Sequence, residues 1–190
     1  MNKKEQASLV RLARRVHRKL APVLFILFLF ISVTGILLGW KKNSNDIIMP
    51  GSHEGSTTNT AMWMSLDTLK SIAFATLHDS LSPDLSTDLD RIDARPSNGM
   101  VKFVFENHYH EIQLDAANGE VLVVAKRRSD IIENIHDGSV LDHVFNIGNG
   151  IFKLFYTSIL GIALFIFTLT GFWLWYGPKL MGKQRKRKKR

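Results

Sequence analysis

The sequence predicts a membrane protein, an α-helical hairpin-type two-span anchor that carries an α+β extracytoplasmic domain of one helix on an antiparallel sheet. Three observations predict this class. Two long runs, residues 20–40 and 154–178, contain no charged side chain. Basic residues are concentrated at the two ends of the chain. Between the runs, alternating apolar segments are separated by Asn-Gly and Pro-containing turns, which is typical of an antiparallel sheet.

The two uncharged runs are long enough to cross a bilayer. They contain 21 and 25 residues, and a helix needs about 20 apolar residues to span the hydrocarbon core. A cleaved signal peptide is an alternative for the first run, but the run is too long and no small-residue cleavage site precedes Trp40-Lys41-Lys42. Both runs are therefore predicted to be transmembrane helices.

The charge distribution predicts the orientation. The first 19 residues contain seven Lys and Arg and one Glu, and residues 179–190 contain eight more basic residues. Residues 41–153 contain 10 basic and 16 acidic side chains. Because basic flanks stay in the cytoplasm, both termini are predicted to be cytoplasmic, with residues 41–153 in the periplasm and the helices in a bacterial inner membrane. The excess positive charge borders the spans, so the predicted partner is the lipid bilayer and not nucleic acid.

The segment between the spans predicts a small α+β domain. Apolar spacing over 65–78 favours a helix with Ser65 as its N-cap. Strands are predicted over 89–93, 100–106, 109–115 and 120–125, with turns at Asn107-His108 and Asn118-Gly119. The predicted core residues are Val101, Phe103, Phe105, Ile112, Leu114, Val121 and Val123.

The predicted organisation has seven segments. They are a cytoplasmic basic segment (1–19), transmembrane helix 1 (20–40), a linker (41–61), the periplasmic domain (62–128), a juxtamembrane segment (129–153), transmembrane helix 2 (154–178) and a basic cytoplasmic tail (179–190).

The residue types exclude several kinds of chemistry. The chain has no cysteine, which excludes disulfides, thiolate metal sites and a cysteine nucleophile. Nucleotide-, flavin- and hydrolase-type motifs are absent, so no catalytic residue is predicted. The pair His108 and His110 is interpreted as a polar hairpin surface, because one hairpin leaves a zinc site short of ligands. The repeated phrases Ser32-Val-Thr-Gly35 and Thr168-Leu-Thr-Gly171 predict close helix packing.

Several short sequence motifs resemble those of the PepSY domain and its associated transmembrane helices. Tyr109-His-Glu-Ile-Gln-Leu-Asp115 followed by Ala-Ala-Asn-Gly119 is similar to the domain signature. The opening Arg14-Arg-Val-His17-Arg18, the approach Asn134-Ile-His136-Asp-Gly138 and the closing Thr170-Gly-Phe-Trp-Leu-Trp175 resemble the transmembrane elements. Larger members have four or more spans with matching histidines, so this chain resembles a reduced two-span member.

The resemblance implies a haem-binding electron-transfer component linked to iron and siderophore reduction. The cofactor would be haem b, with His17 and His136 as ligands of the haem iron and His143 as an additional candidate. If the chain is an enzyme, it is at most a haem-dependent reductase component. One histidine lies at each end of the span region, so one iron cannot bind both, and a homo-oligomer or an envelope protein partner is expected. The alternative is a non-catalytic, membrane-tethered module that binds, inhibits or scaffolds another envelope protein.

Overall fold

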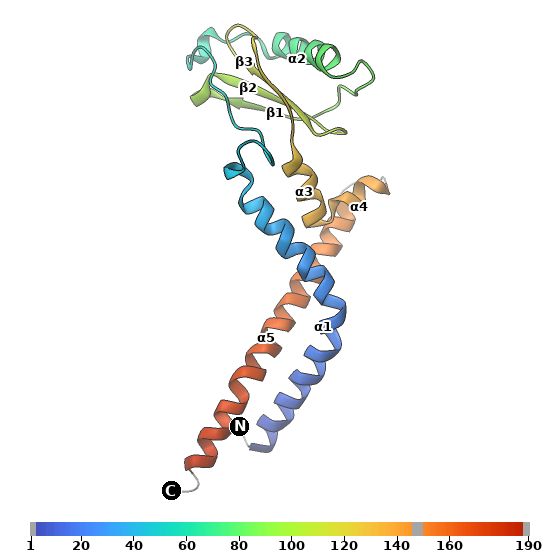
Figure 1. Cartoon of the computed structure of the whole chain (residues 1–190), viewed down its shortest axis with the longest axis vertical. Helices are drawn as coiled ribbons and strands as arrows, with labels where there is room; N and C mark the ends of the chain where they lie inside the picture. Colours follow the sequence, from blue (N-terminus) through green and yellow to red (C-terminus); the bar gives the residue numbers. More distant parts are fainter. Residues whose placement is uncertain (1–2, 146–149, 188–190) are drawn as a thin grey trace. The chain divides into compact units, whose positions relative to one another are not determined.

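The computed structural model describes residues 3–145 and 150–187, and the chain divides into two units (Figure 1). The helical unit comprises Met1–Gly35 and Asn134–Arg190. The sheet unit comprises Ile36–Glu133. Each unit is described separately below.

Two long helices dominate the helical unit. Helix α1 extends over Lys3–Gly39 and α5 over Ile151–Arg187. Each contains a window long and apolar enough to cross a membrane, with mean hydropathy 2.6 in α1 and 1.9 in α5, and few side chains in these windows are buried. Apolar side chains that face outward are expected where lipid is the solvent. The prediction of two apolar helices is confirmed.

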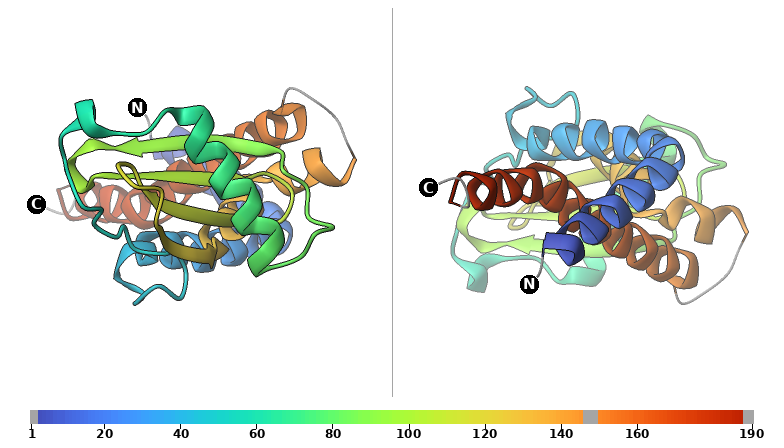
Figure 2. Two further views of the ribbon diagram at one scale, coloured as in Figure 1. Left: turned by 90° about the horizontal axis from the view of Figure 1, so that it is seen from above. Right: turned by 90° about the horizontal axis from the view of Figure 1, so that it is seen from below.

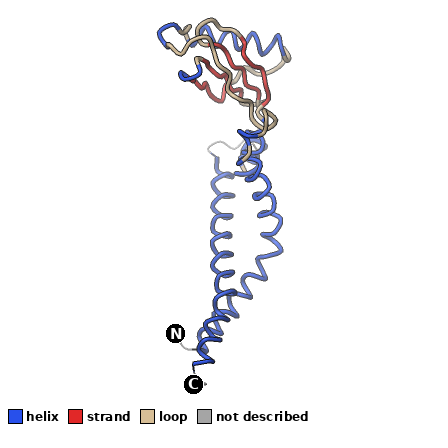
Figure 3. Tube along the Cα trace, turned by 60° about the vertical axis from the view of Figure 1, so that its left-hand side comes forward, coloured by secondary structure: helices blue, strands red, loops and turns tan. Residues whose placement is uncertain are grey.

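The two long helices lie side by side, and the start of α1 lies at the same end of the unit as the end of α5 (Figures 1 and 3). They pack closely at Gly177, where an added Cβ would lie 2.4 Å from Val10 Cγ2. A glycine at this position therefore lets the helices touch. Pro22 lies inside α1, and the helix bends along its length in Figure 1, as expected where proline removes a backbone hydrogen bond.

Two short helices complete the connection to α5. Helix α3 extends over Arg128–Asp137 and α4 over Ser139–Val144. The carboxylate of Asp142 accepts hydrogen bonds from the backbone N–H groups of Phe152 and Lys153, both at 2.9 Å. Asp142 thus caps the first turn of α5.

The sheet unit is a four-stranded antiparallel sheet covered by one helix. The strands are β1 (Leu89–Arg95), β2 (Met100–Phe105), β3 (His110–Asp115) and β4 (Val121–Lys126), in the order β1-β2-β3-β4. Helix α2 (Leu66–Ser80) crosses one face of the sheet (Figure 2). Short 3-10 turns lie at Lys41–Asn43 (η1), Thr60–Met62 (η2) and Pro96–Asn98 (η3).

Local sequence signals fix the ends of these elements. The hydroxyl of Ser65 accepts the Thr68 N–H at 3.1 Å, which confirms the predicted N-cap of α2. Gly119 has φ +75°, and an added Cβ there would lie 2.5 Å from Ile72 Cδ1 on α2. The left-handed backbone conformation therefore favours glycine at this turn, and a larger residue would also displace the end of the Ile72 side chain.

The apolar face of the sheet packs on α2. Phe103, Ile112 and their predicted neighbours Val101, Phe105 and Leu114 are all buried in one cluster with α2. The prediction for β4 is wrong. A register shift between Gln113 and Leu114 pairs Gln113 with Val123 and Leu114 with Val121. Val123 therefore lies on the opposite face, Val121 is 42% exposed, and Val124 packs against the core instead.

The second face of the sheet is covered by residues 48–56. The amide of Gln113 donates to the Gly51 carbonyl and accepts the His53 N–H, at 2.6 and 3.0 Å. The carboxylate of Asp115 accepts the Ser56 N–H at 2.7 Å. These bonds attach part of the predicted linker 41–61 to the sheet, and we call residues 48–56 the strap.

An ionic cluster lies beneath the strap. Glu111 is fully buried and pairs with Arg127 and, at 3.6 Å, with Lys102. Burial lowers the pKa of Lys102 below its ordinary value despite the attraction of Glu111. Burial alone would raise the pKa of Asp130, but hydrogen bonds from Arg127 hold it below its usual range. Removing one member would leave a buried charge uncompensated.

Phe103→Ala should strongly destabilise the sheet unit. The fully buried ring packs under α2, and its loss should reduce the free energy of unfolding by about 3–5 kcal/mol. The measurement is urea unfolding of a 44–133 fragment, which retains the strap. Val121→Ala is the control, and it should change stability by about 0.5 kcal/mol or less because the side chain is exposed. Equal effects of the two changes would contradict the difference in burial between Phe103 and Val121.

Candidate functional site

His17 on α1 faces Thr170 on α5. Its Nδ1 lies 3.0 Å from the Thr170 hydroxyl oxygen. The imidazole also stacks on the Phe167 ring, with centroids 3.7 Å apart. It lines a cavity of about 420 Å³ together with Phe28 and other apolar side chains. We call this arrangement the His17 site.

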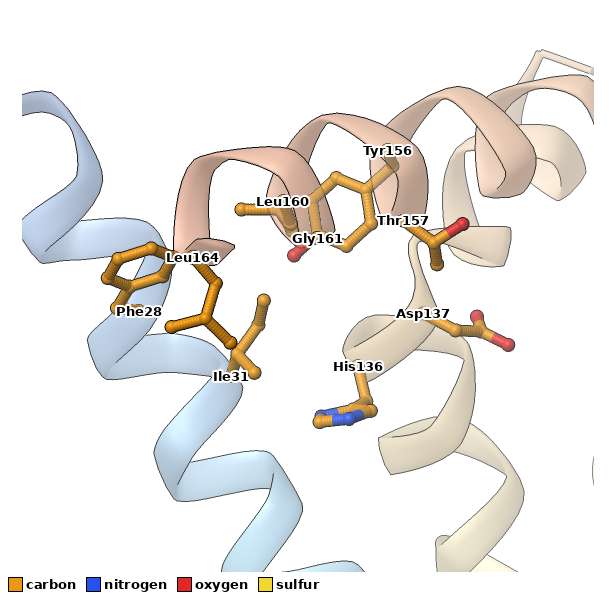
Figure 4. A pocket seen from close by; sticks show the side chains of 9 residues that line it. All are labelled: Phe28, Ile31, His136, Asp137, Tyr156, Thr157, Leu160, Gly161 and Leu164. Carbon is orange, nitrogen blue, oxygen red and sulfur yellow. The ribbon is translucent and has the colours of Figure 1, made fainter. Parts of the chain in front are cut away.

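His136, in the last turn of α3, is bound in the same way by α1. Its Nδ1 lies 2.8 Å from the Thr34 hydroxyl oxygen. It lines a smaller cavity of about 220 Å³, shown in Figure 4, where the imidazole points from α3 toward α1. Side chains of α5, among them Tyr156 and Leu160, form the opposite wall. We call this arrangement the His136 site.

The threonine hydroxyls assign the tautomer of both imidazoles. Each hydroxyl donates its one proton to a carbonyl of its own helix, Thr34 to Phe30 and Thr170 to Ile166, both at 2.8 Å. With the hydroxyl proton on a carbonyl, each oxygen accepts from the imidazole, and this arrangement predicts that Nδ1 of each histidine carries the proton. The Nε2 lone pair of both imidazoles is therefore left to act as a ligand, which is the tautomer that metal-binding histidines need.

A glycine follows each of these threonines. A Cβ added at Gly35 would lie 3.4 Å from Cε1 of His136, and one added at Gly171 would lie 3.9 Å from Cε1 of His17. Both imidazoles thus lie against helix backbone, and the contact is tighter at the His136 site. The repeated Thr-Gly motifs were interpreted from the sequence as helix-packing elements. In the structure, each motif contacts a histidine.

The two sites lie far apart along the helix pair. Thr34 is 17 residues after His17 on α1, which corresponds to about 25 Å at 1.5 Å per residue. One metal ion therefore cannot bind both histidines. The arrangement instead provides two separate sites, each with one imidazole from the described side chains.

The residues that follow His136 make several close contacts. Asp137 pairs with Lys153 on α5 at 2.5 Å and accepts the Ser139 N–H at 2.9 Å. Burial alone would raise the pKa of Asp137, but its bond to Lys153 holds the pKa below the usual range. Gly138 has φ +80°, and a Cβ there would lie 2.7 Å from the Tyr156 ring. Both the backbone conformation and the contact with Tyr156 therefore require glycine at position 138 of the His-Asp-Gly motif.

The remaining histidine candidates are placed differently. His143 lies on α4, but its side chain lies outside the described part of the structure. In the sheet unit, Nδ1 of His108 is 3.0 Å from Nδ1 of His110, and Nε2 of His108 contacts the Ser86 carbonyl at 3.0 Å. Among the described residues, no three His, Asp or Glu side chains are grouped to hold a metal ion.

A comparison with protein families gives one match. The family model described as PepSY-associated TM region matches residues 14–190, which include both histidine sites and both long helices. No curated protein and no solved structure matches the chain significantly.

Thr34→Val should change the tautomer of His136. The substitution removes the acceptor of the Nδ1 proton but keeps the side-chain shape, and losing a bond worth about 1 kcal/mol should shift the tautomer ratio roughly fivefold toward Nε2–H. The measurement is ¹⁵N NMR of histidine-labelled protein in lipid nanodiscs. Thr34→Ser, which retains the hydroxyl, is the control. A wild-type His136 already protonated on Nε2 would contradict the assignment.

Proposed function

We propose, since the chain belongs to the PepSY-associated TM region family, that it is a haem-binding electron-transfer component of a bacterial inner membrane. In this proposal His17 and His136 each bind the iron of a b-type haem, and electrons pass across the membrane for reduction of iron or ferric siderophores. The observation that carries the proposal is that both imidazoles are held through Nδ1, which leaves both Nε2 atoms as ligands.

The chemistry of the two sites fits haem. Neutral imidazole is a common axial ligand of haem iron. A hydrogen bond from Nδ1–H fixes the ring and increases the basicity of Nε2. Apart from the histidine, the walls of both cavities are mostly apolar, as a porphyrin requires. The bound haem would supply one-electron redox chemistry, while the chain supplies ligands, orientation and a water-poor surrounding.

Basic residues near the His17 site suit the propionates of haem. Arg14, Arg15 and Arg18 are exposed and lie within one turn of His17 on α1. Guanidinium groups bind carboxylates with strong, directional contacts. These three residues are proposed to hold the propionates at the cytoplasmic surface, where the positive-inside rule also places them.

Absorption spectra of the purified full-length protein test the cofactor. Protein from haem-replete cells should show a Soret band that sharpens and shifts on reduction with dithionite. His17→Ala should remove the haem of that site and leave the other, His136→Ala should do the reverse, and the double variant should lack both. His53→Ala is the control, because this exposed strap residue should leave the spectrum unchanged. Folded but colourless protein would contradict the proposal and favour a non-catalytic module that binds, inhibits or scaffolds an envelope protein.

The proposed topology has a separate test that uses the absence of cysteine from the chain. Lys4→Cys and Glu120→Cys each introduce one exposed thiol, the first before the apolar part of α1 and the second in the sheet unit. A membrane-impermeant maleimide applied outside the inner membrane should label Glu120→Cys at once and Lys4→Cys only after permeabilisation. The reverse pattern would contradict a periplasmic sheet unit.

A further inference from the structure

We infer that a second copy of this chain completes the His17 site, with His17 of each copy binding one face of a shared haem. The inference rests on the proposed function and adds the partner that the site requires. A haem iron has two axial positions, and electron-transfer haems take both ligands from protein side chains. One chain offers a single ligand at this depth.

The sequence contains no second ligand for the His17 site. Of the seven histidines, only His17 lies in the first 50 residues, and none lies after His143. The chain has no cysteine. Met181 is the only methionine on α5, and it lies 11 residues beyond Thr170, or about 16 Å along the helix. None of the other histidines and methionines described above lies at the depth of His17, which supports a second copy as the source of the other ligand.

The cavity at His17 lies along one face of α1. Its α1 lining residues are spaced by three and four positions, which is the repeat of one helix face, and they include the small residues Ala21 and Ser32. Small residues let membrane helices approach closely. Ala21 and Ser32 on this face would therefore let a second α1 helix approach the His17 site.

The membrane limits how two copies can pair. All copies insert in the same orientation, so a twofold axis that relates them must be parallel to the membrane normal. Such an axis brings the same residue of both copies to the same depth, so that His17 meets the partner's His17. An isologous pair of this kind is self-complementary and closed. A second copy would thus supply a second histidine ligand at the same depth in the membrane, and it would cover the apolar face of α1.

Co-expression of two differently tagged chains, one wild type and one His17→Ala, tests the shared haem. Tandem purification should recover a mixed pair in lipid nanodiscs. The low-spin spectrum of the His17 haem should be lost from the mixed pair altogether, although half of its chains retain His17. If each chain bound this haem alone, half of the signal would remain, and that result would overturn the inference.

Thiol crosslinking tests the face of α1. Ser32→Cys lines the cavity, whereas Phe30→Cys lies about 200° away around the helix and is 61% exposed. With a bis-maleimide, Ser32→Cys should give covalent dimers several-fold more than Phe30→Cys. Equal crosslinking, or no dimer from either variant, would overturn the inference.

The two proposals fail in different ways. A monomer that keeps a haem dependent on His17 would overturn the shared site and leave the proposed function intact. The same holds if the second ligand proves to belong to another envelope protein recovered with the chain. A wild-type chain without haem under all conditions would overturn both.

Discussion

The hydrogen bond from an imidazole Nδ1 to a threonine hydroxyl is the interaction on which the helical unit depends. A buried polar group without a partner is costly, and each histidine pairs its Nδ1 with one threonine hydroxyl. The threonine can accept because its own proton is used by a carbonyl one turn back. One bond therefore fixes the ring orientation, selects the tautomer and joins two helices.

The sheet unit is subject to a different constraint, because both faces of its two central strands, β2 and β3, are buried. One face is apolar and is covered by α2. The other carries Glu111, Gln113 and Asp115, which need partners as well as cover. The strap supplies backbone groups for Gln113 and Asp115, and Arg127 neutralises Glu111. The strap is thus as much a part of this domain as the strands.

Local sequence patterns predicted the elements well. The uncharged runs, the Ser65 cap and the alternation in β2 and β3 each depend on residues close together in the chain, so their structures follow from short-range rules. The core prediction was wrong in β4 because the bulge opposite Gln113 and Leu114 changes which side chains face α2. Nothing in the residues of β4 alone marks this register shift.

Long-range partners could not be read from the sequence. A strap that contains Pro, two Gly and two Ser looks like a linker, because the sheet side chains that bind it are about 60 positions away. The same limit applies to the functional site. His17 and His136 were predicted as candidates, but their pairing with Thr170 and Thr34 spans 153 and 102 positions. The repeated Thr-Gly phrase was the available signal, and it could have been matched to the two histidines.

Phe28 gives the two histidine sites a common wall. It lines both cavities, and its ring meets Phe167 edge-on with centroids 5.8 Å apart, while Phe167 stacks on His17. The space between the sites is therefore bridged by aromatic side chains and not only by aliphatic ones. A continuous series of ring contacts thus runs from His17 through Phe167 to Phe28, which also lines the cavity of His136. The two histidine sites differ in cavity volume, about 420 Å³ at His17 and about 220 Å³ at His136, but they share this aromatic wall.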